Sequence, residues 1–171
     1  MKNLNLDVAH FIEKIHLIKR ILIQKQFNDL PVYHGQIPLL NYVKKHDGCF
    51  QVEIADYLLV TPASIALSTK RLEKAGFLTK KIDSDNLRCK KIYITDKGRE
   101  ITDKCKEIFD TVDSQMLQGF TEDELSQLNL FLERMIKNLS DKNFNNDMSI
   151  LSIGELIKIM KSTHREEKDN D

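Results

Sequence analysis

Residues 61–81, TPASIALSTKRLEKAGFLTKK, place short hydroxyl side chains beside a cluster of cations on one predicted helix. The hydroxyls are Ser64, Ser68 and Thr69, at positions where an ordinary surface helix carries Glu or Lys. Short hydroxyls can approach the edges of nucleic-acid bases, and neighbouring Lys and Arg side chains can contact phosphates or guanine. The residue types therefore favour a helix that contacts nucleic acid. A solvated basic face is the alternative that charge alone leaves open.

The ends of this helix are marked by residues with strong positional preferences. Thr61 is the predicted N-cap, Pro62 takes the first helical position and Gly76 ends the helix. The face predicted to pack inward carries Ile65, Leu72, Ala75 and, as small packing residues, Ser68 or Thr69. The side chains predicted to face outward or along the edges are Ala63, Ser64, Leu67, Lys70, Arg71 and Lys74.

A second short helix, residues 51–58, is predicted just before this one, and Leu59-Val60 leaves room only for a turn. Two short helices joined by a tight turn are the helix-turn-helix arrangement, which places the start of its second helix in the DNA major groove. There we expect Leu67 to contact a thymine methyl group and the backbone N–H groups near Thr61 to favour a phosphate. The side chains expected to contact phosphates or guanine are Lys70, Arg71 and Lys74.

Two strands are predicted after the helix-turn-helix. Residues 77–82 and 89–95 alternate apolar and polar side chains, and the polar loop 83–88 joins them. A hairpin in this place is a wing. Arg88 at its tip is expected to enter the DNA minor groove, with its guanidinium held by Asp83 or Asp85.

Amphipathic helices flank this module on both sides. They are predicted over residues 8–27, with Asp7 as N-cap, over 97–118, which begins at Thr95-Asp96, and over about 121–139, which begins at the capping box Thr121–Glu124. A further helix, 37–46, is predicted within the module. A further capping box at residues 152–155 predicts a short final helix. The flanking helices are more apolar than the module alone can bury, so we expect a second copy of the chain to cover them.

The predicted fold class is therefore mainly α with a small β-wing, in which a winged helix-turn-helix module is embedded between long dimerisation helices. The predicted domain boundaries are an N-terminal dimerisation helix in 1–32, the DNA-binding winged module in 33–95, C-terminal dimerisation helices in 96–140, and an extra helix with a tail in 141–171.

The charge of the chain is distributed in a way that its zero net value conceals. Residues 61–99 hold ten Lys or Arg against four acids, whereas residues 100–171 hold nine basic and sixteen acidic side chains. Because charges are screened beyond roughly 8–10 Å, the local sign decides what a surface attracts. The basic block coincides with the predicted helix and wing, and it favours a DNA partner.

The runs TPASIALSTKRLEKAGFL, DSDNLR and YITDKGRE together resemble winged-helix repressors of the MarR (multiple antibiotic resistance regulator) family. The resemblance covers about residues 8–140. Its most specific part is Leu72-Glu73 with Gly76, followed by Asp83, Asp85, Arg88 and Thr95-Asp96-Lys97-Gly98. The positions that match the reading helix are Pro62, Ala63, Ser64, Leu67 and Arg71, and Arg88 matches the wing arginine. The sequence departs from the family pattern at Leu67 and Leu87, where polar or basic residues are common.

The resemblance implies a homodimer built from the first and last helices, with two reading helices in successive major grooves and two wings in flanking minor grooves. It implies a transcriptional regulator, expected to be a repressor, that binds double-stranded DNA at a pseudo-palindromic operator and is released by a small-molecule effector. No cofactor is expected.

Two alternatives remain open on sequence grounds. One is a winged-helix module that binds a protein partner, and the other is a redox-responsive regulator that uses Cys89 or Cys49. An enzyme is not expected, because no nucleophile–base set, phosphate loop or paired-carboxylate motif occurs. The histidines form no metal-ligand pattern, so no metal site is expected. The chain has neither a membrane-spanning apolar run nor a signal-peptide core, and a cytoplasmic location is expected.

Overall fold

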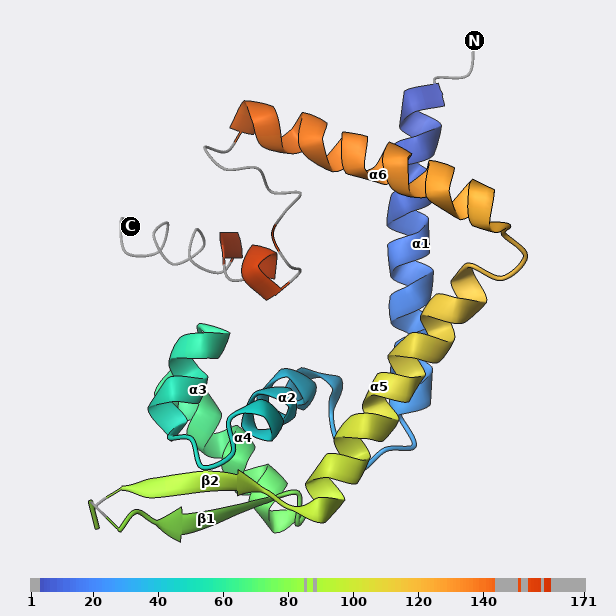
Figure 1. Ribbon diagram of the computed structural model, residues 1–171. Coiled ribbons are helices and arrows are strands. Elements are labelled where there is room, and N and C mark those ends of the chain that lie inside the picture. The colour runs from blue at the N-terminus through green and yellow to red at the C-terminus, as the bar shows by residue number, and fades with distance from the viewer. Residues whose placement is uncertain are drawn as a thin grey trace. The chain divides into compact units, whose positions relative to one another are not determined.

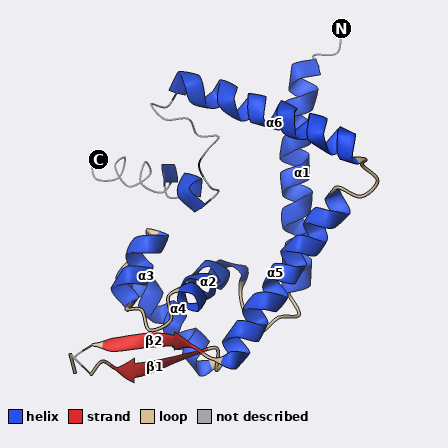
Figure 2. Ribbon diagram, viewed as in Figure 1, coloured by secondary structure: helices blue, strands red, loops and turns tan. Residues whose placement is uncertain are grey.

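The computed structural model describes residues 4–84, 86–87, 89–143, 151, 154–157 and 159–160. Most of these residues are helical, and the only sheet among them has two strands (Figures 1 and 2). The chain divides into two compact units, Met1–Met116 and Leu117–Asp171. The mainly α fold class with a small β-wing is confirmed.

The winged module consists of five elements that follow one another along the chain. They are α2 (Ile37–Lys45), α3 (Gln51–Leu58), α4 (Pro62–Lys74), β1 (Leu78–Ile82) and β2 (Lys90–Ile94). The strands pair antiparallel, with Leu78 opposite Ile94 and Ile82 opposite Lys90. An isolated bridge from Cys49 to Ile92 adds a third segment at the edge of β2. The predicted helix-turn-helix followed by a hairpin is therefore present.

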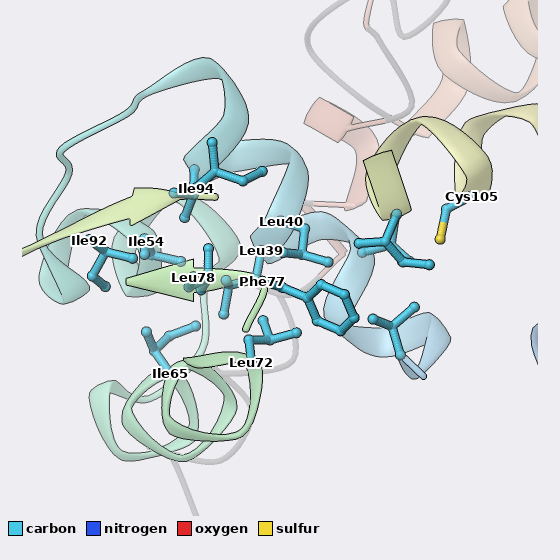
Figure 3. Close-up of a cluster of buried hydrophobic side chains, with 14 of the residues drawn as sticks. Leu39, Leu40, Ile54, Ile65, Leu72, Phe77, Leu78, Ile92, Ile94 and Cys105 are labelled. Atoms are coloured by element: carbon cyan, nitrogen blue, oxygen red, sulfur yellow. The ribbon is translucent and has the colours of Figure 1, made fainter. Parts of the chain in front are cut away.

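One apolar core joins the helices to the wing. In Figure 3, Ile65 and Leu72 point from α4 toward the sheet, where Leu78 and Ile92 lie, and all four side chains are buried. Phe77, at the junction of α4 and β1, is only 1% exposed. Because these side chains interdigitate, the orientation of α4 is fixed by the sheet and by the helices behind it.

Two longer helices complete the first unit. The first, α1 (Leu4–Phe27), packs against α5 (Asp96–Met116), and Lys19 forms an ion pair with Asp113 across this contact. The N-cap prediction for Asp7 is wrong, because the helix already includes Leu4 and Asp7 lies within its first turn. A carboxylate there still interacts favourably with the positive end of the helix dipole. Between α1 and α2, residues His34–Gln36 form the 3-10 helix η1.

The second unit contains α6 (Glu122–Asn143). Its capping box is confirmed, since the backbone N–H of Thr121 donates to the Glu124 carboxylate at 2.8 Å and the Glu124 N–H donates to Thr121 Oγ1 at 3.3 Å. The helix is longer than the predicted 121–139, because the polar residues after Leu139 continue it for one more turn. Residues 154–157 and 159–160 are helical, and the capping box predicted at 152–155 falls partly outside the described residues.

Candidate nucleic-acid interface

The start of α4 is built as its sequence predicts. Thr61 has an extended backbone, and its Oγ1 accepts the backbone N–H of Ser64 at 3.2 Å, while Pro62 takes the first helical position. The hydroxyls of Thr61 and Ser64 also lie 2.9 Å apart and share a hydrogen bond. Ser64 is therefore held against the cap, at the exposed beginning of the helix.

A tight turn with an unusual backbone conformation links α3 to α4. Leu59 has φ 50° and ψ 50°, which is the left-handed region that a side chain makes unfavourable. The N–H of Leu59 donates to Asp56 O, and that of Val60 donates to Ala55 O at 3.1 Å. These bonds satisfy two carbonyl groups at the C-terminal end of α3.

The two faces of α4 differ as predicted. On the inner face, Ile65, Thr69 and Leu72 are buried, and Ser68 and Ala75 are half-buried. Thr69 Oγ1 accepts from Gln51 Nε2 at 2.8 Å and donates to Ala66 O at 3.1 Å, so its hydroxyl ties α4 to α3 and has a packing role. The residues predicted to contact DNA from this helix are all exposed: Thr61, Pro62, Ala63, Ser64, Leu67, Lys70, Arg71 and Lys74.

Leu67 is the one large apolar side chain on the exposed face of α4, and it is 52% exposed. Its neighbours on this face are small or cationic, so the surface combines one apolar contact with hydroxyls and positive charge. Such a combination suits the edges of a DNA major groove, where thymine offers a methyl group and the other edges offer hydrogen-bonding atoms.

The wing is closed near its tip by backbone and side-chain bonds. The N–H of Asp83 donates to Cys89 O at 3.0 Å, and the Asp83 carboxylate forms an ion pair with Lys91 at 2.8 Å. Asp83 is 7% exposed. The carboxylate thus supports the hairpin through Lys91, a partner that sequence reasoning missed. Arg88 and Asp85 lie outside the described residues, and the Arg88 contact remains a prediction.

A groove of about 970 Å³ separates α4 from the wing. Lys70 lines it from α4, Lys80 and Lys90 line it from the strands, and Gln51 and Phe50 lie along its α3 side. Lys80 reaches across to Glu73 of α4 at 3.5 Å. Sequence reasoning did not select Lys80 or Lys90, although the Lys80-Lys81 and Lys90-Lys91 pairs on facing strands were a signal that could have found them.

The cysteines differ in their access to solvent. Burial, with a smaller effect from the Glu53 carboxylate, raises the pKa of the Cys49 thiol to about 11, and burial raises the pKa of Cys105 to about 11 as well. A protonated, buried thiol is a poor nucleophile, so the interpretation of Cys49 as a redox sensor is not supported. Cys89 is half-buried and lines the groove beside Lys90.

The side chains on the described part of the chain offer no group of three metal ligands. What they present is a helix-turn-helix with an exposed reading face, a basic hairpin and a groove between the two. The fold and this surface together define a winged helix-turn-helix protein.

Comparisons with known proteins identify the family. The MarR family model matches residues 32–90. YybA of Bacillus subtilis (strain 168), an uncharacterized HTH-type transcriptional regulator, is 29% identical over 114 residues, which make up 67% of this chain and 76% of that protein. The transcriptional regulator SlyA, known from a crystal structure, is 32% identical in sequence to this chain. The match covers 79% of this chain and 95% of SlyA, with a TM-score of 0.54.

A mutant of S. aureus MepR bound to an oligodeoxyribonucleotide shares the fold, with a TM-score of 0.66 at 22% identity over 78% of this chain and 98% of that chain. The chain belongs to the MarR family. It is a DNA-binding transcriptional regulator and not an enzyme. No helix among the described residues is long and apolar enough to cross a membrane.

Proposed function

We propose that the protein is a homodimeric repressor that binds a pseudo-palindromic operator in double-stranded DNA and leaves it when a small-molecule effector binds. The observation that carries the proposal is the exposed face of α4, where hydroxyl, apolar and cationic side chains lie together on a helix fixed by a buried inner face. An ordinary solvent-exposed helix face carries Glu and Lys in place of this combination.

In this proposal, the first turns of α4 enter the major groove. Thr61, Pro62 and Ala63 approach the DNA backbone, where the positive end of the α4 dipole favours a phosphate. Ser64 and Leu67 approach base edges. Lys70, Arg71 and Lys74 follow along the same exposed side and contact phosphates or guanine.

The wing supplies the second contact. Arg88 is proposed to enter the minor groove beside the site, and Asp83 supports the hairpin that carries it through the Lys91 ion pair. Asp85 is the remaining candidate partner for the Arg88 guanidinium. Lys80 and Lys90, which line the groove between wing and α4, add positive charge on the path between the two contacts.

Dimerisation is supported by the uncovered apolar surface of α1. Eight large apolar side chains between Leu6 and Ile21 are at least 41% exposed, although they occupy a helix that a water-exposed role would make polar. A second copy is the partner proposed for this surface. Residues 1–32 and 96–140 are accordingly proposed to dimerise and residues 33–95 to bind DNA.

An aromatic cluster favours the junction of α1, η1 and α5 as the place where an effector acts. Phe27, His34 and Phe109 have ring centroids 5.5–5.8 Å apart, and the three rings come from α1, η1 and α5. A planar ligand inserted among these rings would change the angle between α1 and the winged module. A ligand that binds one arrangement of these rings better than the other would shift the protein toward that state.

The test is the affinity of three variants for a duplex that the protein selects from a random library, measured by fluorescence anisotropy at several salt concentrations. Arg71→Ala is expected to weaken binding and, if the guanidinium contacts phosphate, to lower the salt slope by about one. Leu67→Ala is expected to relax the preference for thymine at one position. Lys106→Ala, an exposed lysine on α5, is the control and should behave as wild type.

Unchanged affinity in both Arg71→Ala and Leu67→Ala would contradict the assignment of α4 as the reading helix. If the protein also failed to bind any duplex at low salt, the winged module would have to serve a protein partner instead.

A further inference from the structure

We propose that Lys97 is a positioning residue, which fixes the C-terminal end of α4 to the start of α5 and makes no phosphate contact. The proposal rests on the assignment of α4 as the reading helix. It gives a role to a lysine that lies in the basic block and that charge alone would place among the DNA contacts.

The Lys97 ammonium already has two partners at the end of α4. Nζ donates a hydrogen bond to Ala75 O at 2.9 Å, and it lies 4.9 Å from the centroid of the Phe77 ring. Ala75 is the C-cap of α4. A cation at this end of a helix interacts favourably with the carbonyl groups that have no helical partner and with the negative end of the dipole.

Two further bonds from the same segment complete what we call the clasp, which comprises residues 95–98 and the carbonyls of residues 75–77. Thr95 Oγ1 donates to Gly76 O at 2.7 Å, and the Thr95 N–H donates to Phe77 O at 3.1 Å. Three consecutive carbonyls after α4 therefore accept hydrogen bonds from two residues that lead into α5. The Gly98 N–H in turn donates to Thr95 Oγ1 at 3.0 Å, which caps α5.

The backbone of the clasp approaches Phe77 closely, and the residue at the point of closest approach is Gly98. A Cβ added at Gly98 would lie 2.1 Å from Phe77 O and 2.8 Å from Ile94 Cγ1, distances at which the backbone would have to shift. The segment therefore holds the end of α4 by backbone contact as well as by hydrogen bonds.

The same helix is attached to the rest of the first unit further along. Arg99 pairs with Asp47 at 3.0 Å, Lys44 pairs with Asp103, and Lys19 of α1 pairs with Asp113. Figure 1 shows β2 leading directly into α5. A change in the direction of α5 relative to the module would therefore pull on the carbonyl end of α4, and the clasp is the connection through which it would act.

The contacts of Lys97 argue against a phosphate contact. Its ammonium lies against the C-terminal end of α4, where Ala75 O and the Phe77 ring already hold it. A phosphate would have to replace both partners. Lys70, in contrast, lies on the exposed face in the middle of α4 and lines the groove.

The proposal is tested with Lys97→Met, Lys97→Arg, Lys70→Ala and, as a matched control on α5, Lys106→Met. Affinity for the selected duplex is measured by anisotropy over a range of salt. Hydrogen exchange of the free protein reports on the last turn of α4. Lys97→Met should weaken binding about three- to tenfold with an unchanged salt slope, as expected for loss of a charged helix-end bond. Lys97→Arg should restore most of the affinity.

Lys70→Ala should instead lower the salt slope by about one. In the free protein, Lys97→Met should speed exchange of amides near Lys74–Phe77, and Lys106→Met should not. A lower salt slope in Lys97→Met would make the residue a phosphate contact and overturn the proposal, and so would unchanged exchange at the end of α4. If Arg71→Ala and Leu67→Ala bind normally, the DNA-reading assignment fails, while the exchange measurement still decides whether the clasp exists.

Discussion

Two hydroxyl side chains five residues apart on α4 differ in burial and in hydrogen-bond partners. Thr69 is fully buried and bonds both Gln51 and Ala66 O, whereas Ser64 is exposed and bonds the cap. Helical periodicity was enough to separate them, because Thr69 falls on the stripe with Ile65 and Leu72. Periodicity could not predict that Gln51 would be the hydrogen-bond partner of Thr69, since that contact depends on how α3 crosses α4.

We expect Thr69→Val to destabilise the protein by about 1 kcal/mol, because the half-buried Gln51 amide loses its acceptor while the substitution keeps the volume. Ser64→Ala should cost less, since Ser64 is exposed, although it should weaken base discrimination. Urea denaturation followed by circular dichroism measures both free energies of unfolding. A Thr69→Val variant as stable as wild type would show that the hydroxyl contributes only volume.

The thiols should react in the order of their access to solvent. Because burial raises the pKa of Cys49 and Cys105 to about 11, only about one thiol in a thousand is ionised at pH 8. We expect iodoacetamide at pH 8 to label Cys89 first, and the labelling rate of Cys49 to rise about tenfold per pH unit below pH 11 while the fold persists. Peptide mass spectrometry measures the order, and preferential labelling of Cys49 would restore it as a redox candidate.

At the scale of elements, caps and breakers located the ends of α4 well, because Thr61, Pro62 and Gly76 each have a strong positional preference. The start of α1 and the end of α6 were predicted less well. Neither end carries a residue that forbids helix, so residues 4–7 extend α1 and residues 140–143 extend α6. The left-handed turn at Leu59 had no sequence signal, since Leu is not a residue that favours this conformation.

Replacement of Gly98 tests the junction of β2, α4 and α5. Because an added Cβ would press on Phe77 O and Ile94, Gly98→Ala should destabilise the protein by about 1–3 kcal/mol. Gly35→Ala is the matched control, because no atom lies within 4 Å of a Cβ built there. Urea denaturation compares the two variants. Equal stability of both would mean that the backbone at Gly98 relaxes freely.

At the scale of the whole molecule, the basic block and the surplus of apolar surface on the flanking helices could be predicted from the sequence, because both follow from composition along the chain. The sequence did not predict the groove between α4 and the wing, or the role of Lys80 within it. Both depend on the distance between a helix and a hairpin, which is set by the packing of Leu72, Phe77 and Leu78 in the core.

The exposed apolar side of α1 leads to a prediction about assembly. Ile15 and Ile18 are 49% and 50% exposed, and placing two carboxylates there should block an apolar interface because burying unpaired charge is costly. We expect Ile15→Glu with Ile18→Glu to be monomeric by sedimentation equilibrium, with weaker DNA binding and an unchanged helix content. The control is Lys14→Glu on the same helix. A double variant that remains dimeric would place the dimer contact elsewhere.

The most direct test of the account is the selection of bound duplexes from a random library by the purified protein at low salt. A dimer that reads DNA through two copies of α4 should recover an inverted repeat, with half-sites about 10 bp apart centre to centre or a multiple of that spacing. Recovery of no shared motif by a folded, dimeric protein would contradict the account.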